Sequence, residues 1–154
     1  KQMHQLEDLR ICGDNLSRFP SLPASSSVRY LYVENSMFSD YSSLKEYRNT
    51  KELSLSNSVL FDVHIDSLIS DMQTLDSVWL NDSLLLKCPN FSHNKLLQHL
   101  DISENLICSL DSFDWILHTP LLKSLLLQKN IFSLNYYSFK QSFGSMQLEN
   151  CGRN

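Results

Sequence analysis

The chain has 154 residues and a formal net charge of −4, which allow one domain with a sizeable core. The acidic balance disfavours nucleic acid as a partner, because phosphate binding needs clustered Lys and Arg side chains. With three glycines, none of them close together, a glycine-rich phosphate loop is excluded, and no apolar run approaches the roughly 18 residues that span a bilayer.

Apolar residues recur along the whole chain in one pattern. Each copy has apolar residues at positions 4 and 6, and the six full copies have another at position 11. Position 1 is usually apolar, and position 9 is a small polar residue in most copies. The residues at position 4 are Leu9, Leu31, Leu53, Val78, Leu100, Leu125 and Met146, spaced by 22, 22, 25, 22, 25 and 21 residues. Agreement at positions 4 and 6 in every copy indicates a true internal repeat.

Within each copy, positions 4 and 6 alternate with positions 3, 5 and 7, which is the period of a β-strand. A single short strand cannot bury its apolar side alone, so the copies must stack into one parallel sheet. We expect residues 1–154 to form a single domain of about six full repeats and a partial seventh. Because the chain begins with Lys1 and both ends stop within a repeat, we expect a fragment of a longer protein, with uncapped ends that favour self-association.

Two copies nearly match the pattern L-x-x-L-x-L-x-x-N-x-L: residues 97–107 (LQHLDISENLI) and residues 122–132 (LKSLLLQKNIF). The chain therefore resembles the leucine-rich repeat proteins over residues 6–151. The resemblance implies an α/β solenoid with a curved parallel sheet on the concave side, short helices and irregular crossovers on the convex side, and protein binding as its function.

Position 9 departs from this pattern in most copies. An asparagine there can hydrogen-bond the buried backbone of the turn with both of its amide groups. Asparagine is kept as Asn105 and Asn130, whereas the other copies carry Asp14, Ser36, Ser58, Ser83 and Cys151. The chain is therefore interpreted as a divergent member of unclear subfamily.

The segments between the strands predict the convex side. Residues 19–27 are too rich in proline and serine for a helix and predict an extended crossover. Three later segments have apolar residues at helical spacing, and we expect these to face the core. They are Phe61, Ile65, Leu68, Ile69 and Met72 with a cap near Asp62; Leu110, Phe113, Ile116 and Leu117 with a cap at Asp111 and a stop at Pro120; and Phe139, Phe143 and Met146 after Asn135.

Outward strand positions 3, 5 and 7 should line the concave face, which the resemblance implies is the binding face. Many of them are small, such as Ser54, Ser77 and Ser103, whereas large apolar side chains there are costly in water unless a partner covers them. The candidate partner-binding residues are Tyr30, Tyr32, Glu34, Glu52, Trp79, Asn81, His99, Asp101, Leu126 and Gln128. Alternatively, neighbouring strands or a flanking segment of the parent chain cover the aromatic side chains.

The same face is acidic. One basic residue, Arg10, stands against Asp8, Glu34, Glu52, Asp101 and Glu149. This bias favours encounter with a protein that presents a basic and partly apolar patch. The alternative is a solvated face with no partner, because acidic residues are common at soluble surfaces.

Metal binding and catalysis have weaker support. Cys88, His93, His99 and Cys108 have the residue types of a zinc site, but their spacing is loose and the repeat register keeps them apart. His99 beside Asp101 resembles a base with its orienting carboxylate, yet a nucleophile and an anion-stabilising loop are missing. We therefore expect no metal, no cofactor and no enzyme activity.

The cysteines and the glycosylation sequons bear on the cellular compartment of the protein. In the repeat order, Cys88 and Cys108 are the one candidate disulfide pair, and terminal cysteine clusters are absent, so reduced thiols favour the cytoplasm or nucleus. Against this stand three glycosylation sequons, which begin at Asn15, Asn81 and Asn90.

The sequence thus predicts an intracellular adaptor or targeting module that binds a protein. Two alternatives remain: a fragment of an extracellular receptor or adhesion protein, and the substrate-recognition or regulatory arm of a ubiquitin ligase or phosphatase complex.

Overall fold

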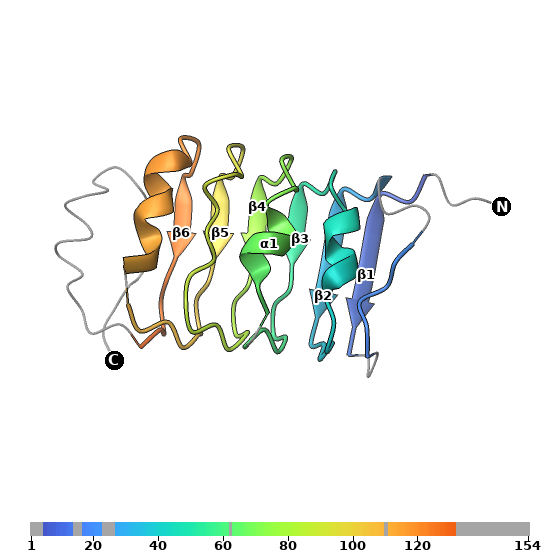
Figure 1. Cartoon of the computed structure of the whole chain (residues 1–154), viewed down its shortest axis with the longest axis horizontal. Helices are drawn as coiled ribbons and strands as arrows, with labels where there is room; N and C mark the ends of the chain where they lie inside the picture. The colour runs from blue at the N-terminus through green and yellow to red at the C-terminus, as the bar shows by residue number, and fades with distance from the viewer. Residues whose placement is uncertain (1–4, 14–16, 23–26, 62, 110, 132–154) are drawn as a thin grey trace.

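The computed structural model describes residues 5–13, 17–22, 27–61, 63–109 and 111–131. Six short strands form one sheet in which each strand pairs with the next along the chain. They are β1 Asp8–Cys12, β2 Tyr30–Glu34, β3 Glu52–Ser54, β4 Ser77–Trp79, β5 His99–Asp101 and β6 Ser124–Leu126. Figure 1 shows them side by side in chain order.

All five pairings are parallel and keep one register. The position-4 residues are direct partners from strand to strand, in the order Leu9, Leu31, Leu53, Val78, Leu100 and Leu125. This confirms the predicted repeat. The register matters because a slip of one residue would turn every apolar side chain of a strand toward solvent.

The inward side chains form one core along the sheet. Leu31 and Leu53 at position 4, and Val33 and Leu55 at position 6, are completely buried. Each such side chain stabilises the fold by roughly 1.5–3 kcal/mol relative to an exposed one. Since the core is shared between neighbouring repeats, each repeat depends on the next for its stability.

One face of the sheet is covered by the returning segments (Figure 1). These segments contain the 3₁₀ helix η2 (Ser42–Glu46), the helix α1 (Ile65–Ile69) and the 3₁₀ helix η3 (Asp111–His118). The sequence did not predict η2. Both α1 and η3 lie in repeats of 25 residues, where the extra length relative to 22 gives the chain room for a helical turn. All helices in the described part of the chain are too short or too polar to cross a membrane.

The helical stripe around α1 is partly as predicted. Ile65, Ile69 and Met72 are buried, which confirms that this stripe faces the core. Phe61 is instead 50% exposed, because α1 begins four residues later and Phe61 lies in the preceding turn. His64 stands at the start of α1 and makes no side-chain capping hydrogen bond.

The stripe in η3 needs one correction. Phe113 and Ile116 are buried as predicted, but Leu117 is 72% exposed. The cause is the helix type: a 3₁₀ helix has three residues per turn, so Phe113 and Ile116 share a face and Leu117 turns away from it. Trp115, which the stripe omitted, is buried against Phe91 with ring centroids 5.2 Å apart.

Several predictions fall outside the described residues. They concern the third helical stripe, the strand of the seventh copy, both chain ends with their expected self-association, and the individual residues Asp14, Asp62, Leu110, Glu149 and Cys151.

Aromatic packing fills the space behind β1 and β2. The ring of Phe19 lies 5.5 Å from that of Phe38 and 5.4 Å from that of Tyr47. The Tyr47 hydroxyl donates a hydrogen bond of 2.9 Å to the carbonyl of Pro20. These contacts hold residues 19–22, which contain no helix, in agreement with the predicted crossover.

Position 9 carries polar side chains, of which those of Ser83, Asn105 and Asn130 bond the backbone of the preceding repeat. The amide oxygen of Asn105 accepts hydrogen bonds from the backbone N–H groups of Ser83 at 3.0 Å and Leu85 at 2.9 Å. Its amide nitrogen donates to the carbonyls of Leu80 at 2.9 Å and Ile102 at 3.0 Å. The prediction that asparagine uses both amide groups here is confirmed.

A serine at position 9 makes fewer hydrogen bonds of this kind than an asparagine. The Ser83 hydroxyl donates to the carbonyl of Leu55 at 2.9 Å and accepts from the N–H of Ser58 at 3.4 Å. A hydroxyl has one hydrogen to donate, so a serine satisfies fewer backbone groups than an asparagine.

Position 8 adopts the left-handed conformation in every described repeat, which the sequence analysis did not predict. The residues there are Gly13, Asn35, Asn57, Asp82, Glu104 and Lys129, with φ between 52° and 67°. Gly, Asn and Asp tolerate this conformation, whereas Glu104 and Lys129 carry a strain of roughly 1–2 kcal/mol. The recurrence shows that the turn after each strand imposes the conformation.

The hydrogen bonds of position 9 predict that two substitutions at Asn105 lower the free energy of unfolding by different amounts. Asn105→Ala should lower the free energy of unfolding by about 4 kcal/mol, because two buried N–H groups lose their acceptor. Asn105→Ser should cost less, because neighbouring repeats already use serine. Urea unfolding of both variants measures the difference. Equal losses would show that serine cannot substitute for asparagine here, and a negligible loss in Asn105→Ala would show that these hydrogen bonds contribute little to stability.

Candidate binding face

The side of the sheet opposite the helices, here called the open face, carries the outward strand residues. The parallel register lines up the position-5 residues in one row across the strands, in the order Arg10, Tyr32, Ser54, Trp79, Asp101 and Leu126. A second row holds the position-3 residues Asp8, Tyr30, Glu52, Ser77, His99 and Ser124. Residues far apart in the sequence therefore form one surface.

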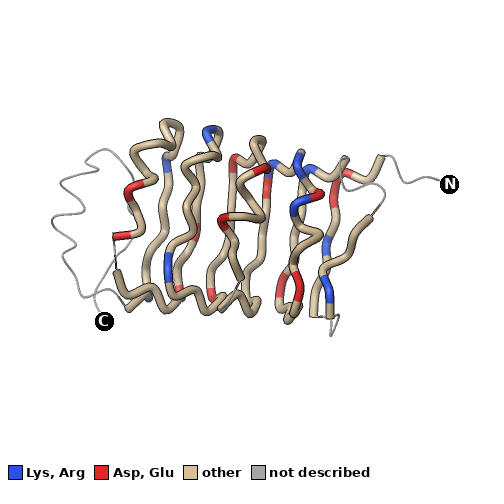
Figure 2. The backbone as a smooth tube through the Cα atoms, in the orientation of Figure 1, with Lys and Arg blue, Asp and Glu red and all other residues tan. Residues whose placement is uncertain are grey.

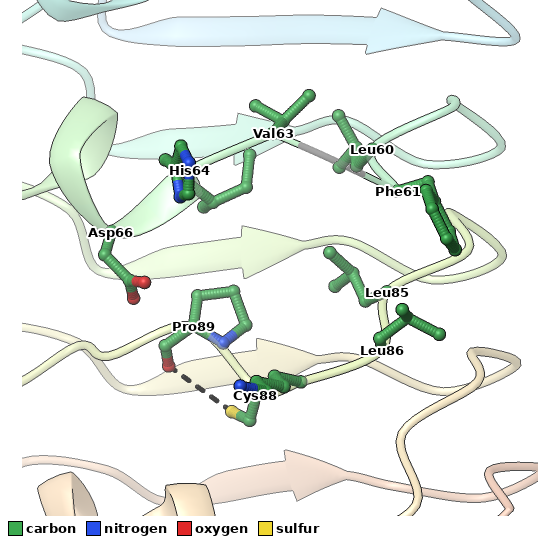
Figure 3. A pocket seen from close by; sticks show the side chains of 11 residues that line it. Leu60, Phe61, Val63, His64, Asp66, Leu85, Leu86, Cys88 and Pro89 are labelled. Carbon is green, nitrogen blue, oxygen red and sulfur yellow. Dashed lines mark hydrogen bonds between the residues drawn. The ribbon is translucent and has the colours of Figure 1, made fainter.

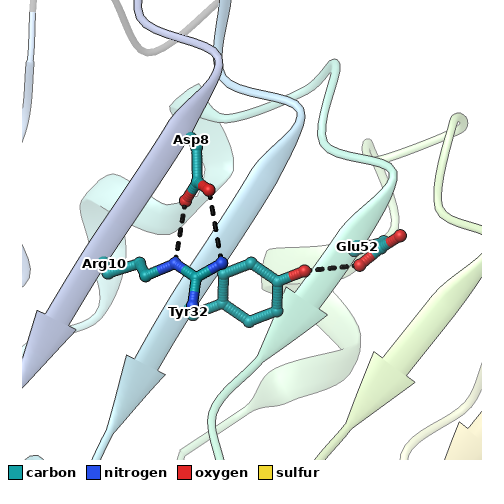
Figure 4. Close-up of polar contacts among 4 residues, drawn as sticks. All are labelled: Asp8, Arg10, Tyr32 and Glu52. Atoms are coloured by element: carbon teal, nitrogen blue, oxygen red, sulfur yellow. Dashed lines mark hydrogen bonds and ion pairs between the residues drawn. The ribbon is translucent and has the colours of Figure 1, made fainter.

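Tyr32 is held from both sides (Figure 4). Its hydroxyl donates a 2.5 Å hydrogen bond to the carboxylate of Glu52 on the next strand. On the other side, the Arg10 guanidinium lies 4.6 Å from the centre of the Tyr32 ring and binds Asp8 through two hydrogen bonds of 3.2 and 3.3 Å. The ring is therefore oriented before any partner arrives.

This setting changes the acidity of the phenol. Partial burial, followed by the hydrogen bond to Glu52 and the charge of that carboxylate, raises the pKa of Tyr32 to about 12. At neutral pH the hydroxyl is protonated and remains a donor to Glu52.

A second polar network runs across β2, β3 and the turn after β4. The Ser54 hydroxyl donates to Glu34 at 3.3 Å and lies 3.1 Å from that of Ser56, which donates to the Asn81 side-chain oxygen at 2.7 Å. The small residues of this face do not line it as predicted: Ser54, Ser56, Ser77 and Ser103 are buried. Their short side chains lie below the level of larger neighbours.

The predicted acidity of the face needs a refinement. The carboxylate of Asp8 is paired with Arg10, and Glu149 lies outside the described residues. Within the described chain, Glu34, Glu52 and Asp101 accept hydrogen bonds from hydroxyl groups and form no ion pair. Basic residues are distributed along the tube in Figure 2 and do not gather in one patch.

The other candidate residues lie on the same surface. Tyr30, Trp79, Leu126 and Gln128 are half-buried and His99 is exposed. Part of each side chain is thus open to a partner, and none of the described residues covers the face. The structure places all ten candidate residues on one side of the sheet, and their role in binding stays a prediction.

A pocket lies elsewhere, between α1 and the segment that follows β4 (Figure 3). Its volume is about 490 Å³, and its apolar wall includes Phe61, Ile65, Leu85, Leu86 and Pro89. Polar groups at its border come from His64, Asp66 and Lys87. Sequence analysis did not find this pocket.

The cysteines are free in the described part of the chain. Cys88, which also lines the pocket, is buried, and its burial raises the pKa of its thiol. Cys12 and Cys108 are exposed, and the candidate pair of Cys88 with Cys108 is not a disulfide in this structure. No three His, Cys, Asp or Glu side chains among the described residues lie close enough to hold a metal ion.

Position 10 of the repeat forms a further surface, which was not predicted from the sequence. The five described residues at that position are apolar and at least one-third exposed: Met37, Val59, Leu84, Leu106 and Ile131. The signal was present as an apolar residue between the polar position 9 and the apolar position 11 in five successive copies.

Comparison with known proteins shows which folds this architecture resembles. No protein-family model and no curated protein matches the sequence. An internalin (inlF) of Listeria monocytogenes aligns with a TM-score of 0.60 at 21% identity, over 73% of this chain and 32% of that one. A leucine-rich repeat protein of Leptospira interrogans aligns with a TM-score of 0.56 at 15% identity, over 96% and 50%. The chain folds as a leucine-rich repeat solenoid.

The solenoid is similar to a second Listeria protein, internalin C2, with a TM-score of 0.55 and 16% identity over 87% of this chain and 66% of that one. This leucine-rich repeat chain spans between 32% and 66% of the length of these three structures. At such identities the likeness establishes the fold.

The raised pKa of Tyr32 predicts a pH dependence of stability. The folded protein holds this proton more tightly than the unfolded chain, whose tyrosines titrate near pH 10. The stabilisation is therefore complete below pH 10 and is lost as the pH rises toward 12. Tyr47, whose pKa is also raised to about 12 by burial, adds a similar contribution.

Urea unfolding between pH 9 and pH 11.5 should therefore show a falling free energy of unfolding, with a shallower fall in Tyr32→Phe. Glu52→Gln should give an intermediate slope, because burial still acts on the phenol. A Tyr32→Phe slope identical to that of the original protein would contradict the assignment.

Proposed function

We propose that the solenoid is a protein-binding scaffold that receives its partner on the open face. The observation that carries this proposal is the row of half-buried Tyr32, Trp79 and Leu126 on a sheet face that the described residues leave uncovered. Aromatic side chains held in place lose little conformational freedom on binding, which is why Tyr and Trp are favoured interface anchors.

The chemistry of the partner follows from the charges. Glu34, Glu52 and Asp101 lie around Trp79 and Tyr32, and none forms an ion pair within the described chain. A partner with Lys or Arg beside an apolar patch would supply the missing counter-charges and cover the aromatic rings. Cation–π contact with Trp79 adds to this preference.

We also propose that the scaffold works inside the cell as an adaptor or targeting module. Free thiols at Cys12, Cys88 and Cys108 support this assignment, since a reducing compartment keeps such groups unpaired. The Asn81 side chain is half-buried and bonded to Ser56, a poor position for a glycan, although Asn90 is exposed.

The open face can be tested with a matched pair of double variants. Trp79→Ala with Leu126→Ala removes two anchors, whereas Leu117→Ala with Leu121→Ala removes exposed apolar surface from the other side of the molecule. Proteins cross-linked to the intact chain in cells are identified by mass spectrometry, and the purified candidates are then titrated against each variant.

We expect at least one candidate to lose tenfold or more in affinity for the open-face variant and none for the matched control. The affinity should also weaken with salt. If every candidate binds both variants as well as the original chain, the open face is not the binding site.

The compartment has a separate test. Alkylation of the native protein taken from cells should label Cys12 and Cys108 and spare the buried Cys88, and intact mass should show no glycan at Asn90. A glycan mass, or thiols that react only after reduction, would assign the protein to the extracellular side.

A further inference from the structure

The position-10 residues form a continuous apolar edge, here called the ridge: Met37, Val59, Leu84, Leu106 and Ile131. Met37, Val59, Leu84 and Leu106 each stand between a buried position 9 and a buried position 11, so their side chains point away from the core. The exposed fractions of the five ridge residues are 68%, 37%, 41%, 36% and 59% in chain order. At the strand spacing of about 4.8 Å, the ridge is about 19 Å long.

Backbone hydrogen bonds tie three of the ridge residues to the preceding repeat. The N–H of Leu106 donates to the carbonyl of Leu85 at 2.9 Å, and that of Ile131 to Ile107 at 3.0 Å, one repeat earlier in each case. The N–H of Val59 also donates to the preceding repeat, but to the position-9 carbonyl of Ser36, at 3.3 Å. The apolar side chains therefore recur at the spacing of the repeats.

The pocket beside α1 adjoins the middle of the ridge. Phe61 and Leu86, which line the pocket, stand two residues after Val59 and Leu84, and they are 50% and 42% exposed. Ridge and pocket thus form one apolar surface with a depression of about 490 Å³, a size within the range of ligand pockets.

Leu84 has an unfavourable backbone for its residue type. Its φ is 57°, in the left-handed region, and it is the one position-10 residue in the described chain with a positive φ. Asparagine or glycine would suit this conformation better, and 41% of Leu84 faces water. A strained and exposed leucine is typical of a site retained for binding.

The charges beside the ridge select its occupant. Asp82 stands at position 8, on the sheet side of Leu84, is exposed and has no basic partner among the described residues. Glu104, next along this border, is paired with Lys129 at 3.0 Å. An anionic membrane would be repelled by Asp82, and a second copy packed two-fold about Leu84 would bring the two Asp82 carboxylates together.

We propose that the ridge and pocket dock an amphipathic helix of a partner protein, with a bulky apolar side chain in the pocket and a basic side chain facing Asp82. A helix lying along the ridge presents apolar side chains once per turn, every 5.4 Å, which matches the repeat spacing within about half an ångström. This second surface is distinct from the open face and allows the scaffold to join two partners.

The probes are two synthetic 14-residue helices, kept helical by lactam bridges because short helices are marginal in water. Both carry the same Leu and Phe stripe, flanked by Lys in one and by Glu in the other. The whole chain is titrated with each labelled helix by fluorescence anisotropy at low and at high salt. The lysine helix should bind at least tenfold more tightly, and salt should narrow the difference.

Two variants assign the binding to the ridge. Leu84→Asn with Phe61→Ser should weaken binding of the lysine helix at least tenfold while the melting temperature stays within a few degrees, since asparagine relieves the backbone at position 84. Asp82→Asn should remove most of the preference for lysine over glutamate. Trp79→Ala, on the open face, serves as the control and should leave helix binding unchanged, whatever the fate of the proposed function.

Equal affinity for the two helices, or full affinity in the double variant, would overturn the proposal. Sedimentation analysis and flotation with phosphatidylcholine vesicles complete the test. If the double variant abolished self-association or vesicle binding instead, the ridge would belong to a second copy or to a lipid surface, and the helix assignment would be wrong.

Discussion

The fold depends on one constraint: strands of three to five residues can bury their inward side chains only by pairing in register with their neighbours. Two sets of contacts maintain that register. Leu53, Val78 and Leu100 pack as direct partners on the inward side of the sheet. Beyond the strand ends, the amide of Asn105 bonds the turn of the preceding repeat. Loss of register would reverse the two sides of the sheet, so the core and the open face are specified by the same contacts.

The same register creates the surfaces on which function is proposed. Residues that occupy one position of the repeat become neighbours at the strand spacing, whatever their distance in sequence. On the open face this produces an oriented Tyr32 and carboxylates such as Glu52, which have no ion pair within the described residues and suit a basic partner. At the edge of the sheet it produces the apolar ridge around Leu84. Asp82, next to the ridge, also favours a basic partner, and the shape of the ridge suits a helix. The helices cover one face of the sheet, and none of the described residues covers the open face. The open face and the ridge are therefore two distinct surfaces of the solenoid.

Much of the architecture was predictable, because the buried positions repeat and chance rarely produces such a pattern. The strands, their order, the register and the role of Asn105 followed from it. Details that depend on the phase of the helices could not be predicted from this pattern. The exposed Leu117 follows from a 3₁₀ geometry that the spacing of apolar residues does not reveal. Left-handed turns were hinted at by Gly13 and Asn35, but Glu104 carries no such signal and is forced into the conformation by its neighbours. The candidate residues were predicted to share one side of the sheet, and the register places them there. The hydrogen bonds that bury Ser54 could not be predicted from the sequence.

Nuclear magnetic resonance of the isotopically labelled chain can test the strand register. The stacked register should give nuclear Overhauser effects between strand protons that connect Leu31 to Leu53, Leu53 to Val78, and Val78 to Leu100, in the parallel pattern. Contacts in an antiparallel pattern, or a pairing shifted by one residue, would contradict the stacked register and every surface derived from it.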